Sequence, residues 1–357
     1  MIRILCVGLL LVSLSPRPSS ADEPVTLENV APSGKNVADE PVAKEFSLER
    51  AGAFLDTASL HWQKSRQCFT CHTNYAYLMA RPYLGADTTA HRQVREFAEE
   101  LVEKRWAEKG PRWDAEVVAT AAALAINDAA TTGKLHPLTR TALDRIWTVQ
   151  RDDGGFDWLK CGWPPMENDD EYGAVLAAIA VGSAPENYRS QPQAQVGIAK
   201  LQKYLRETKW PTLHHRAMLV WASAAWPELL TAEDRERTLA DLSSRQLPDG
   251  GWSASSLGDW KRGDDTPQTP DVADGYGTGF VLFVLQKGGV PATDPRIEKG
   301  ITWLKTNQRE SGRWFTRSLH KDNHHFLTHA GSAFAVMALG EAGALPRPET
   351  PVSLRQP

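Results

Sequence analysis

The sequence predicts an all-α fold, an α6/α6 toroid in which six helical hairpins form an inner and an outer ring. Three observations favour this fold. A Gln/Gly/aromatic turn motif recurs, amphipathic segments alternate with wholly apolar ones, and the pair of segments recurs six times in the 357 residues. At roughly 150 residues per domain, the length alone would suggest two domains. The repeat instead favours a single toroidal domain, residues 46–344.

The N-terminal end of the chain resembles an export signal. Arg3 precedes the apolar run 4–12, and small residues lead to Ala21. This pattern predicts a secretory signal peptide, residues 1–21, with an uncleaved N-terminal anchor as the alternative. The apolar run is too short to span a bilayer, so we expect no transmembrane span. We therefore expect an exported, periplasmic protein.

The segments that flank the repeat differ from it in composition. Residues 22–45 are acidic and contain no aromatic residue, and residues 345–357 are rich in Pro. Segments of this composition cannot bury enough apolar surface to fold on their own. The sequence therefore predicts a disordered linker before the toroid and a disordered tail after it.

The turn motif has the form Gln-x-x-x-Gly-x-aromatic and follows an amphipathic segment with apolar residues on one helical face. It occurs as Gln150-Gly154-Phe156, Gln246-Gly250-Trp252 and Gln308-Gly312-Trp314. Before the last copy, Asp294-Pro295 supplies a helix cap and a Pro at the first helical position. Each amphipathic segment is therefore predicted to be an outer helix.

A second, wholly apolar segment completes each hairpin. A helix that is apolar on every face is buried on every side, which predicts an inner helix. The six inner helices are expected to begin near His72, Ala115, Asp170, His214, Asp274 and His325. A closed ring of six hairpins leaves no open end that would need a cap, unlike a solenoid.

The segment from Lys299 to Trp314 resembles the QW motif of squalene–hopene cyclases and other terpenoid-cyclase toroids. The resemblance implies an α/α toroid, although one fold hosts many functions. In that family a D-x-D-D motif supplies the proton donor. The nearest match here is Glu167-Asn168-Asp169-Asp170, in which Asp169 takes the donor's place and Glu167 departs from the family pattern.

The first hairpin contains a haem attachment signature, the C-x-x-C-H segment from Cys68 through Cys71 to His72. Two thiols three residues apart can bond both haem vinyl groups, and the adjacent imidazole then binds the iron. Export is compatible with this chemistry, and no nearby Cys or His pair completes a zinc site. The motif predicts covalent haem c with His72 as proximal ligand. A redox-active Cys pair and a structural or metal role are the alternatives.

All inner helices of a toroid begin at the same end, so their first residues are expected to converge at one mouth. The candidate distal haem ligands there are His214, His215 and His325, and an open sixth position is the alternative. The candidate catalytic acids at this end are Asp169, Asp170 and Asp274, for which helix capping is the other explanation.

The charge balance, 40 Lys and Arg against 44 Asp and Glu, argues against a nucleic-acid partner. Three functions remain. The first is an exported haem protein that binds or oxidises an apolar molecule, such as an isoprenoid, beside the haem. The second is a cofactor-free cyclase that uses Asp169 as its acid. The third is an electron-transfer cytochrome with a redox partner. Cys161 has no assigned role.

Overall fold

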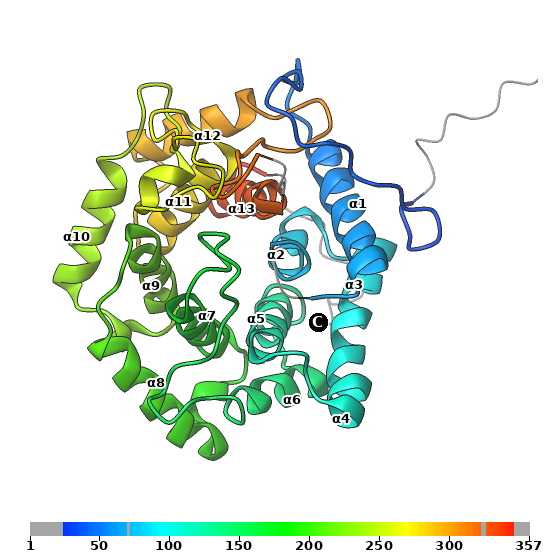
Figure 1. The fold of residues 1–357 in the computed structure, drawn as a ribbon, viewed down its shortest axis with the longest axis vertical. Coiled ribbons are helices and arrows are strands. Elements are labelled where there is room, and N and C mark those ends of the chain that lie inside the picture. The colour runs from blue at the N-terminus through cyan, green and yellow to red at the C-terminus, as the bar shows by residue number, and fades with distance from the viewer. Residues whose placement is uncertain (1–23, 70–71, 323–325, 346–357) are drawn as a thin grey trace, which may run out of the picture.

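The computed structural model describes residues 24–69, 72–322 and 326–345. Viewed down its short axis, the molecule shows an inner ring of helices enclosed by an outer ring (Figure 1). The α6/α6 toroid predicted from the sequence is confirmed.

The inner ring closes on itself, because each of its helices contacts the next and α13 contacts α2. Over the described residues the ring consists of α2 (Asn74–Ala80), α5 (Asp114–Thr131), α7 (Asp170–Ser183), α9 (Leu213–Ala225), α11 (Gly275–Lys287) and α13 (Phe326–Glu341). Each inner helix begins within two residues of the position expected from the sequence.

The outer ring lies against the inner helices and supplies the first member of each hairpin. It contains α1 (Leu48–Arg66), α3 (Thr89–Glu100), α4 (Trp106–Lys109), α6 (Pro137–Ile146), α8 (Gln195–Glu207), α10 (Ala232–Ser243) and α12 (Pro295–Thr306). One π-helical turn, η2 (Leu101–Arg105), joins α3 to α4. Short 3₁₀ turns are η1 (Arg81–Leu84), η3 (Tyr188–Ser190), η4 (Pro192–Ala194), η5 (Pro227–Leu229) and η6 (Ala254–Leu257).

The inner helices pack closely because their sequences are apolar and include small residues. All residues of α11 from Gly275 to Leu285 are buried. A Cβ atom at Gly279 would lie 2.5 Å from the backbone nitrogen of Ala335 in α13. Glycine at this position therefore allows the two helix backbones to approach each other.

The turn motif joins each outer helix to the next one. Gln308 Nε2 donates to the carbonyl oxygens of Gly312, at 3.1 Å, and Ser47, at 2.9 Å. Since Ser47 caps α1, this last turn closes the ring on the first helix. The Trp314 indole N–H donates to Leu304 O at 2.7 Å. Equivalent bonds run from Gln150 to Gly197 and from Gln246 to Arg296.

Residues 24–45 form an N-terminal strap that is hydrogen-bonded to the toroid. Asn36 Nδ2 donates to Thr316 O at 3.2 Å, and Glu40 forms an ion pair with Arg313 at 2.9 Å. The disordered linker expected over residues 22–45 thus coincides with a segment that contacts the toroid. Val25, Leu27 and Val30 of the strap also pack against the hydrophobic core.

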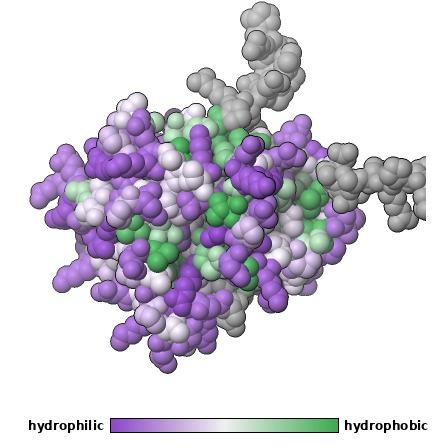
Figure 2. Space-filling view, turned by 90° about the horizontal axis from the view of Figure 1, so that it is seen from above, coloured by the Kyte–Doolittle hydropathy of each residue, from purple (hydrophilic) through white to green (hydrophobic). Residues whose placement is uncertain are grey.

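The surface is mainly hydrophilic on the face that Figure 2 shows, with hydrophobic residues in small separate patches. Among the helices of the described residues, none is both long and apolar enough to cross a membrane. The predicted signal peptide and the tail beyond residue 345 lie outside the described residues, so both remain predictions.

Candidate functional site

The N-terminal ends of the inner helices carry polar residues that the sequence analysis singled out. Asp169 caps α7 by accepting a hydrogen bond from Tyr172 N at 3.1 Å. Asp274 caps α11 in the same way, with Gly277 N at 2.8 Å. A side-chain cap of this kind stabilises a helix by about 1 kcal/mol. Capping is therefore one role of both residues.

The C-x-x-C-H segment lies at the junction between α1 and α2. Gln67 ends α1 in a left-handed conformation with φ of 46°, and the buried Cys68 follows it. His72 is 3% exposed and precedes α2 by two residues. Cys71 lies outside the described residues. The structure thus places two of the three predicted haem-binding residues in the protein interior.

His72 faces a buried carboxylate. Its Nδ1 lies 3.6 Å from Oε1 of Glu167, whose side chain is 2% exposed. Within the described residues this oxygen has no hydrogen-bond partner. The separation is longer than a hydrogen bond, so the two groups form a close electrostatic contact. A carboxylate in this position disposes the imidazole toward the tautomer with its proton on Nδ1, which keeps a lone pair on Nε2 for a metal.

A cavity of about 730 Å³ is lined by Phe326, the ring that stacks on this histidine, although His72 itself does not line it. The Phe326 ring stacks on His72 with centroids 5.8 Å apart, and Trp62 packs edge-on against Phe326 at 4.8 Å. Both aromatic residues line the cavity, which is enclosed by the N-terminal strap, α1 and α13; we call it the strap cavity. Its volume lies within the range of roughly 300–1,000 Å³ that is typical of ligand and cofactor sites.

The residues around the strap cavity fit a haem. Lys35 and Arg66 line it and would provide cations for the propionates. The indole N–H of Trp62 is buried and has no hydrogen-bond partner among the described residues, so it is an unused donor in the cavity wall. A search of the same residues finds no group of three or more His, Cys, Asp and Glu side chains that could hold a metal ion.

Two further histidines line the strap cavity, and sequence reasoning missed both. His329 is 6% exposed, with Nδ1 3.0 Å from Thr73 Oγ1, and His61 belongs to α1. His329 follows the predicted candidate His325 by one helical turn, which was a usable signal. Nothing in the sequence distinguished His61.

His214 is placed in the core of the toroid. Its Nε2 lies 2.8 Å from the Tyr276 hydroxyl, and its ring stacks on Phe280 at 4.4 Å. Burial lowers the pKa of His214 well below its ordinary value, which keeps the imidazole neutral. To bind iron, His214 would have to leave this aromatic packing.

His215 has both ring nitrogens in hydrogen bonds. Nδ1 lies 2.7 Å from Thr212 Oγ1, and Nε2 lies 2.8 Å from Asp169 Oδ1. The geometry therefore does not favour His215 as a distal ligand. The third predicted candidate, His325, lies outside the described residues.

Asp169 and Asp170 are held as carboxylates. Burial alone would raise both pKa values, but His215 outweighs it for Asp169, and the pairing with Arg151 and Lys160 does so for Asp170. Both pKa values are lowered as a result. A cyclase needs a protonated acid, so this geometry does not favour Asp169 as the donor.

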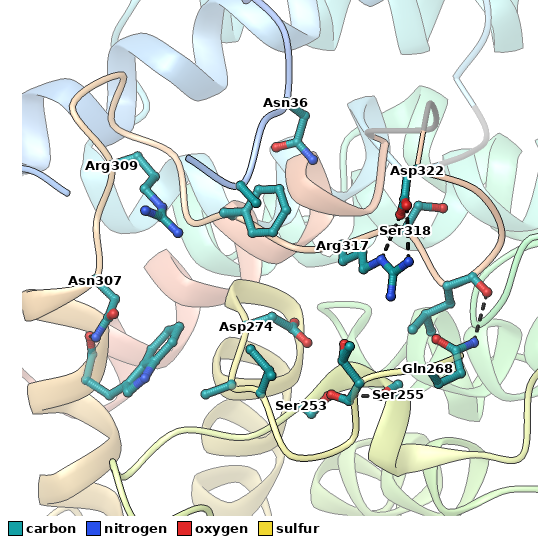
Figure 3. A pocket seen from close by; sticks show the side chains of 17 residues that line it. Asn36, Ser253, Ser255, Gln268, Asp274, Asn307, Arg309, Arg317, Ser318 and Asp322 are labelled. Atoms are coloured by element: carbon teal, nitrogen blue, oxygen red, sulfur yellow. Dashed lines mark hydrogen bonds and ion pairs between the residues drawn. The ribbon is translucent and has the colours of Figure 1, made fainter. Parts of the chain in front are cut away.

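Asp274 behaves differently from the other two candidate acids. Its carboxylate accepts the backbone N–H groups of Gly277, at 2.8 Å, and Ala254, at 2.7 Å, yet burial raises its pKa to about 6. It lines a second cavity of about 450 Å³, which we call the polar pocket (Figure 3). Asp274 is thus the candidate acid whose protonation changes near neutral pH.

Cys161 is an exposed free thiol. Partial desolvation and the nearby Glu167 raise its pKa to about 11. The group is therefore protonated at neutral pH and lacks the thiolate character of a reactive cysteine.

No protein-family model matches this chain, and no curated protein matches it. Solved structures of the same architecture do match. A glycosidase in complex with glucose matches with a TM-score of 0.55 at 12% identity, over 83% of this chain and 97% of that one. A polysaccharide lyase matches with a TM-score of 0.51 at 13% identity, over 82% and 97%.

The ent-copalyl diphosphate synthase from Streptomyces platensis matches with a TM-score of 0.51 at 16% identity, over 76% of this chain. The present chain spans 50% of that synthase. At such identities the likeness shows the α/α toroid fold alone. The terpenoid-cyclase-like toroid expected from the QW motif is therefore supported as a fold.

Proposed function

We propose that this chain is an exported c-type haem protein whose toroid binds or oxidises an apolar molecule beside the haem. The observation that carries the proposal is the buried pair of His72 and Glu167 at the C-x-x-C-H segment. The nearby carboxylate would orient the imidazole as a metal ligand, and the strap cavity, which Phe326 lines, has the volume of a cofactor site.

Cys68, Cys71 and His72 would hold the haem, which supplies one-electron chemistry at its iron when bound. The chain's own residues prepare this position. The Glu167 carboxylate, 3.6 Å from His72 Nδ1, would make the imidazole a stronger donor through its charge. Phe326 covers the imidazole and keeps water from it. The apolar part of the cavity wall, including Trp62, suits an apolar guest.

The first test is covalent haem in the full chain produced in a host with c-type maturation. We expect a pyridine haemochrome spectrum, haem retained on a denaturing gel, and a mature N-terminus at Asp22. Cys68→Ser is expected to remove one thioether bond and shift the haemochrome band. Protein that carries no covalent haem under these conditions would reject the proposal.

The second test concerns Glu167. Glu167→Gln weakens the acceptor for His72 Nδ1, so we expect a higher reduction potential and a weaker iron–imidazole stretch in the Raman spectrum. The control is Glu171→Gln in the first turn of α7, four residues further on, for which no ion pair with His72 is found among the described residues. Equal effects of the two variants would reject the positioning role of Glu167.

The coordination state then separates ligand chemistry from simple electron transfer. An open sixth position, with a Soret shift when an isoprenoid alcohol is added, is the expected result. A six-coordinate spectrum that isoprenoids leave unchanged would instead indicate an electron-transfer cytochrome. Alanine variants of His61 and His329, the two histidines that line the strap cavity, would then identify the distal ligand.

A further inference from the structure

The polar pocket is separate from the haem motif, and its lining includes neither Cys68 nor His72. It lies between the N-terminus of α11 and the loop that follows α12. Figure 3 shows Arg309 and Arg317 on one side of the space, and Asp274, Ser253 and Ser255 on the opposite side. Its volume of about 450 Å³ is in the range of small-molecule sites.

The two guanidinium groups of the pocket differ in how much of their bonding capacity is used. Arg317 is saturated, because it donates to Asp322 at 2.7 Å, to Pro267 O at 3.0 Å and to Thr266 Oγ1 at 3.1 Å. Arg309 instead donates one bond, from Nη1 to Glu40 O at 2.7 Å.

The Nε atom of Arg309 is buried and has no hydrogen-bond partner in the described part of the chain. No carboxylate of the described residues lies within ion-pair distance of this guanidinium. A buried N–H of a charged group is unfavourable when it has no acceptor. The pocket therefore offers an unneutralised cation, and its natural complement is a carboxylate.

Hydroxyl and amide groups line the rest of the pocket. Ser253 donates to Thr269 O at 2.9 Å and lies 3.0 Å from Ser255 Oγ, so both hydroxyls retain lone pairs for a ligand. Asn307 Nδ2 donates a hydrogen bond to Trp303 O at 3.0 Å, and Asn307 Oδ1 accepts none from the described residues. These acceptors suit a ligand that carries several hydroxyl groups.

Apolar surface lies between the charged and the polar groups. Trp303 and Phe315 both line the pocket, and the Arg309 guanidinium lies 5.7 Å from the centre of the Phe315 ring. Aromatic rings provide flat apolar contact for the C–H faces of a small saturated ring. The pocket thus combines one cation, several hydrogen-bond acceptors and aromatic surface.

We propose that the polar pocket binds a small polyhydroxylated carboxylate of monosaccharide size, a sugar acid, through Arg309 and the acceptors Ser253, Ser255 and Asn307. Asp274, whose pKa is raised to about 6, faces the same space and becomes neutral as the pH falls. The other charged groups of the lining are Arg317 and Asp322, which are paired with each other. An anion therefore binds more tightly at pH 5.5 than at pH 7.5.

The experiment is isothermal titration of the purified full chain with glucuronate, glucose and acetate. Glucuronate is expected to bind at least tenfold more tightly than either of the others. Glucose has the hydroxyl groups without the carboxylate, and acetate has the carboxylate without the hydroxyl groups. Arg309→Gln is expected to weaken glucuronate binding by about tenfold to a hundredfold and to leave glucose binding unchanged. Ser255→Ala is expected to weaken both sugars.

The control is Lys305→Gln, which removes an exposed cation from α12 outside the pocket. Thermal unfolding of each variant establishes that it is folded. The proposal is overturned if glucuronate fails to bind, if it binds no better than glucose, or if Arg309→Gln behaves like Lys305→Gln. Protein with and without covalent haem should give the same affinities, so the outcome is independent of the haem proposal.

Discussion

Closure of the ring at the last turn motif leads to a quantitative prediction for Gly312→Ala. Gly312 has φ of 92°, and a Cβ atom there would lie 2.0 Å from Arg50 O and 2.4 Å from Arg50 C. These are backbone atoms of α1, so they cannot move unless the helix shifts. The substitution therefore forces the last turn away from the first outer helix.

Two costs contribute to the expected loss of stability. An L-residue at a positive φ costs roughly 1–2 kcal/mol, and overpacking against fixed atoms costs roughly 1–3 kcal/mol. Gly289→Ala isolates the first cost, because Gly289 has φ of 96° and nothing within 4 Å of its Cβ position. The loss of unfolded-state entropy is the same in both variants and cancels. Gly312→Ala should thus lose about 1–3 kcal/mol more than Gly289→Ala.

The assay is equilibrium unfolding in urea, followed by tryptophan fluorescence and circular dichroism, with the slopes compared between variants. Gly250→Ala should fall between the other two, because its Cβ would lie 2.9 Å from Lys299 O. If Gly312→Ala and Gly289→Ala agree within about 0.5 kcal/mol, the steric account of ring closure is refuted.

Three further predictions concern buried polar contacts. Arg105 donates to both carboxylate oxygens of Glu116, whose side chain is 0% exposed. Arg105→Met leaves that carboxylate buried without its partner, so urea unfolding should show a loss of about 3–5 kcal/mol in stability. The double variant with Glu116→Leu should recover much of this loss. Trp314→Phe removes the hydrogen bond from the indole N–H to Leu304 O, so stability should fall by about 1–2 kcal/mol. This loss should appear as a lower Tm, and an unchanged Tm would contradict the prediction. His215→Gln should raise the pKa of Asp169 in an NMR titration, because His215 lowers it against the effect of burial. The stability that Asp169 contributes is present above its unfolded pKa near 4 and is lost as the pH falls through its lowered folded value.

The fold was predictable because its determinants are local in the sequence. Gln308 and Gly312 lie four residues apart and define one turn, and the apolar run of α11 identifies an inner helix without knowledge of its neighbours. Because these local signals repeat along the chain, they predict that the hairpins form a ring. The positions of the helix starts followed from them to within two residues.

The site was less predictable, because its contacts join distant segments. Glu167 approaches His72 across two hairpins, and no spacing rule connects the two residues. His329 lines the strap cavity because of the rotation of α13, which a helix that is apolar on nearly every face does not reveal. The His214 and His215 doublet looked like a ligand pair in the sequence, but its nitrogens bond within the core.

The N-terminal strap shows what composition alone does not reveal about this part of the chain. A segment with no aromatic residue cannot form a core, but it can lie on one that already exists. Asn36 bonds to Thr316 O and accepts from the Thr328 hydroxyl, and it lines both the strap cavity and the polar pocket. Because Asp322 also borders both cavities, the two spaces are neighbours at the same end of the last hairpin. The strap therefore forms part of the wall of both candidate sites through Asn36, the residue that ties it to the last hairpin.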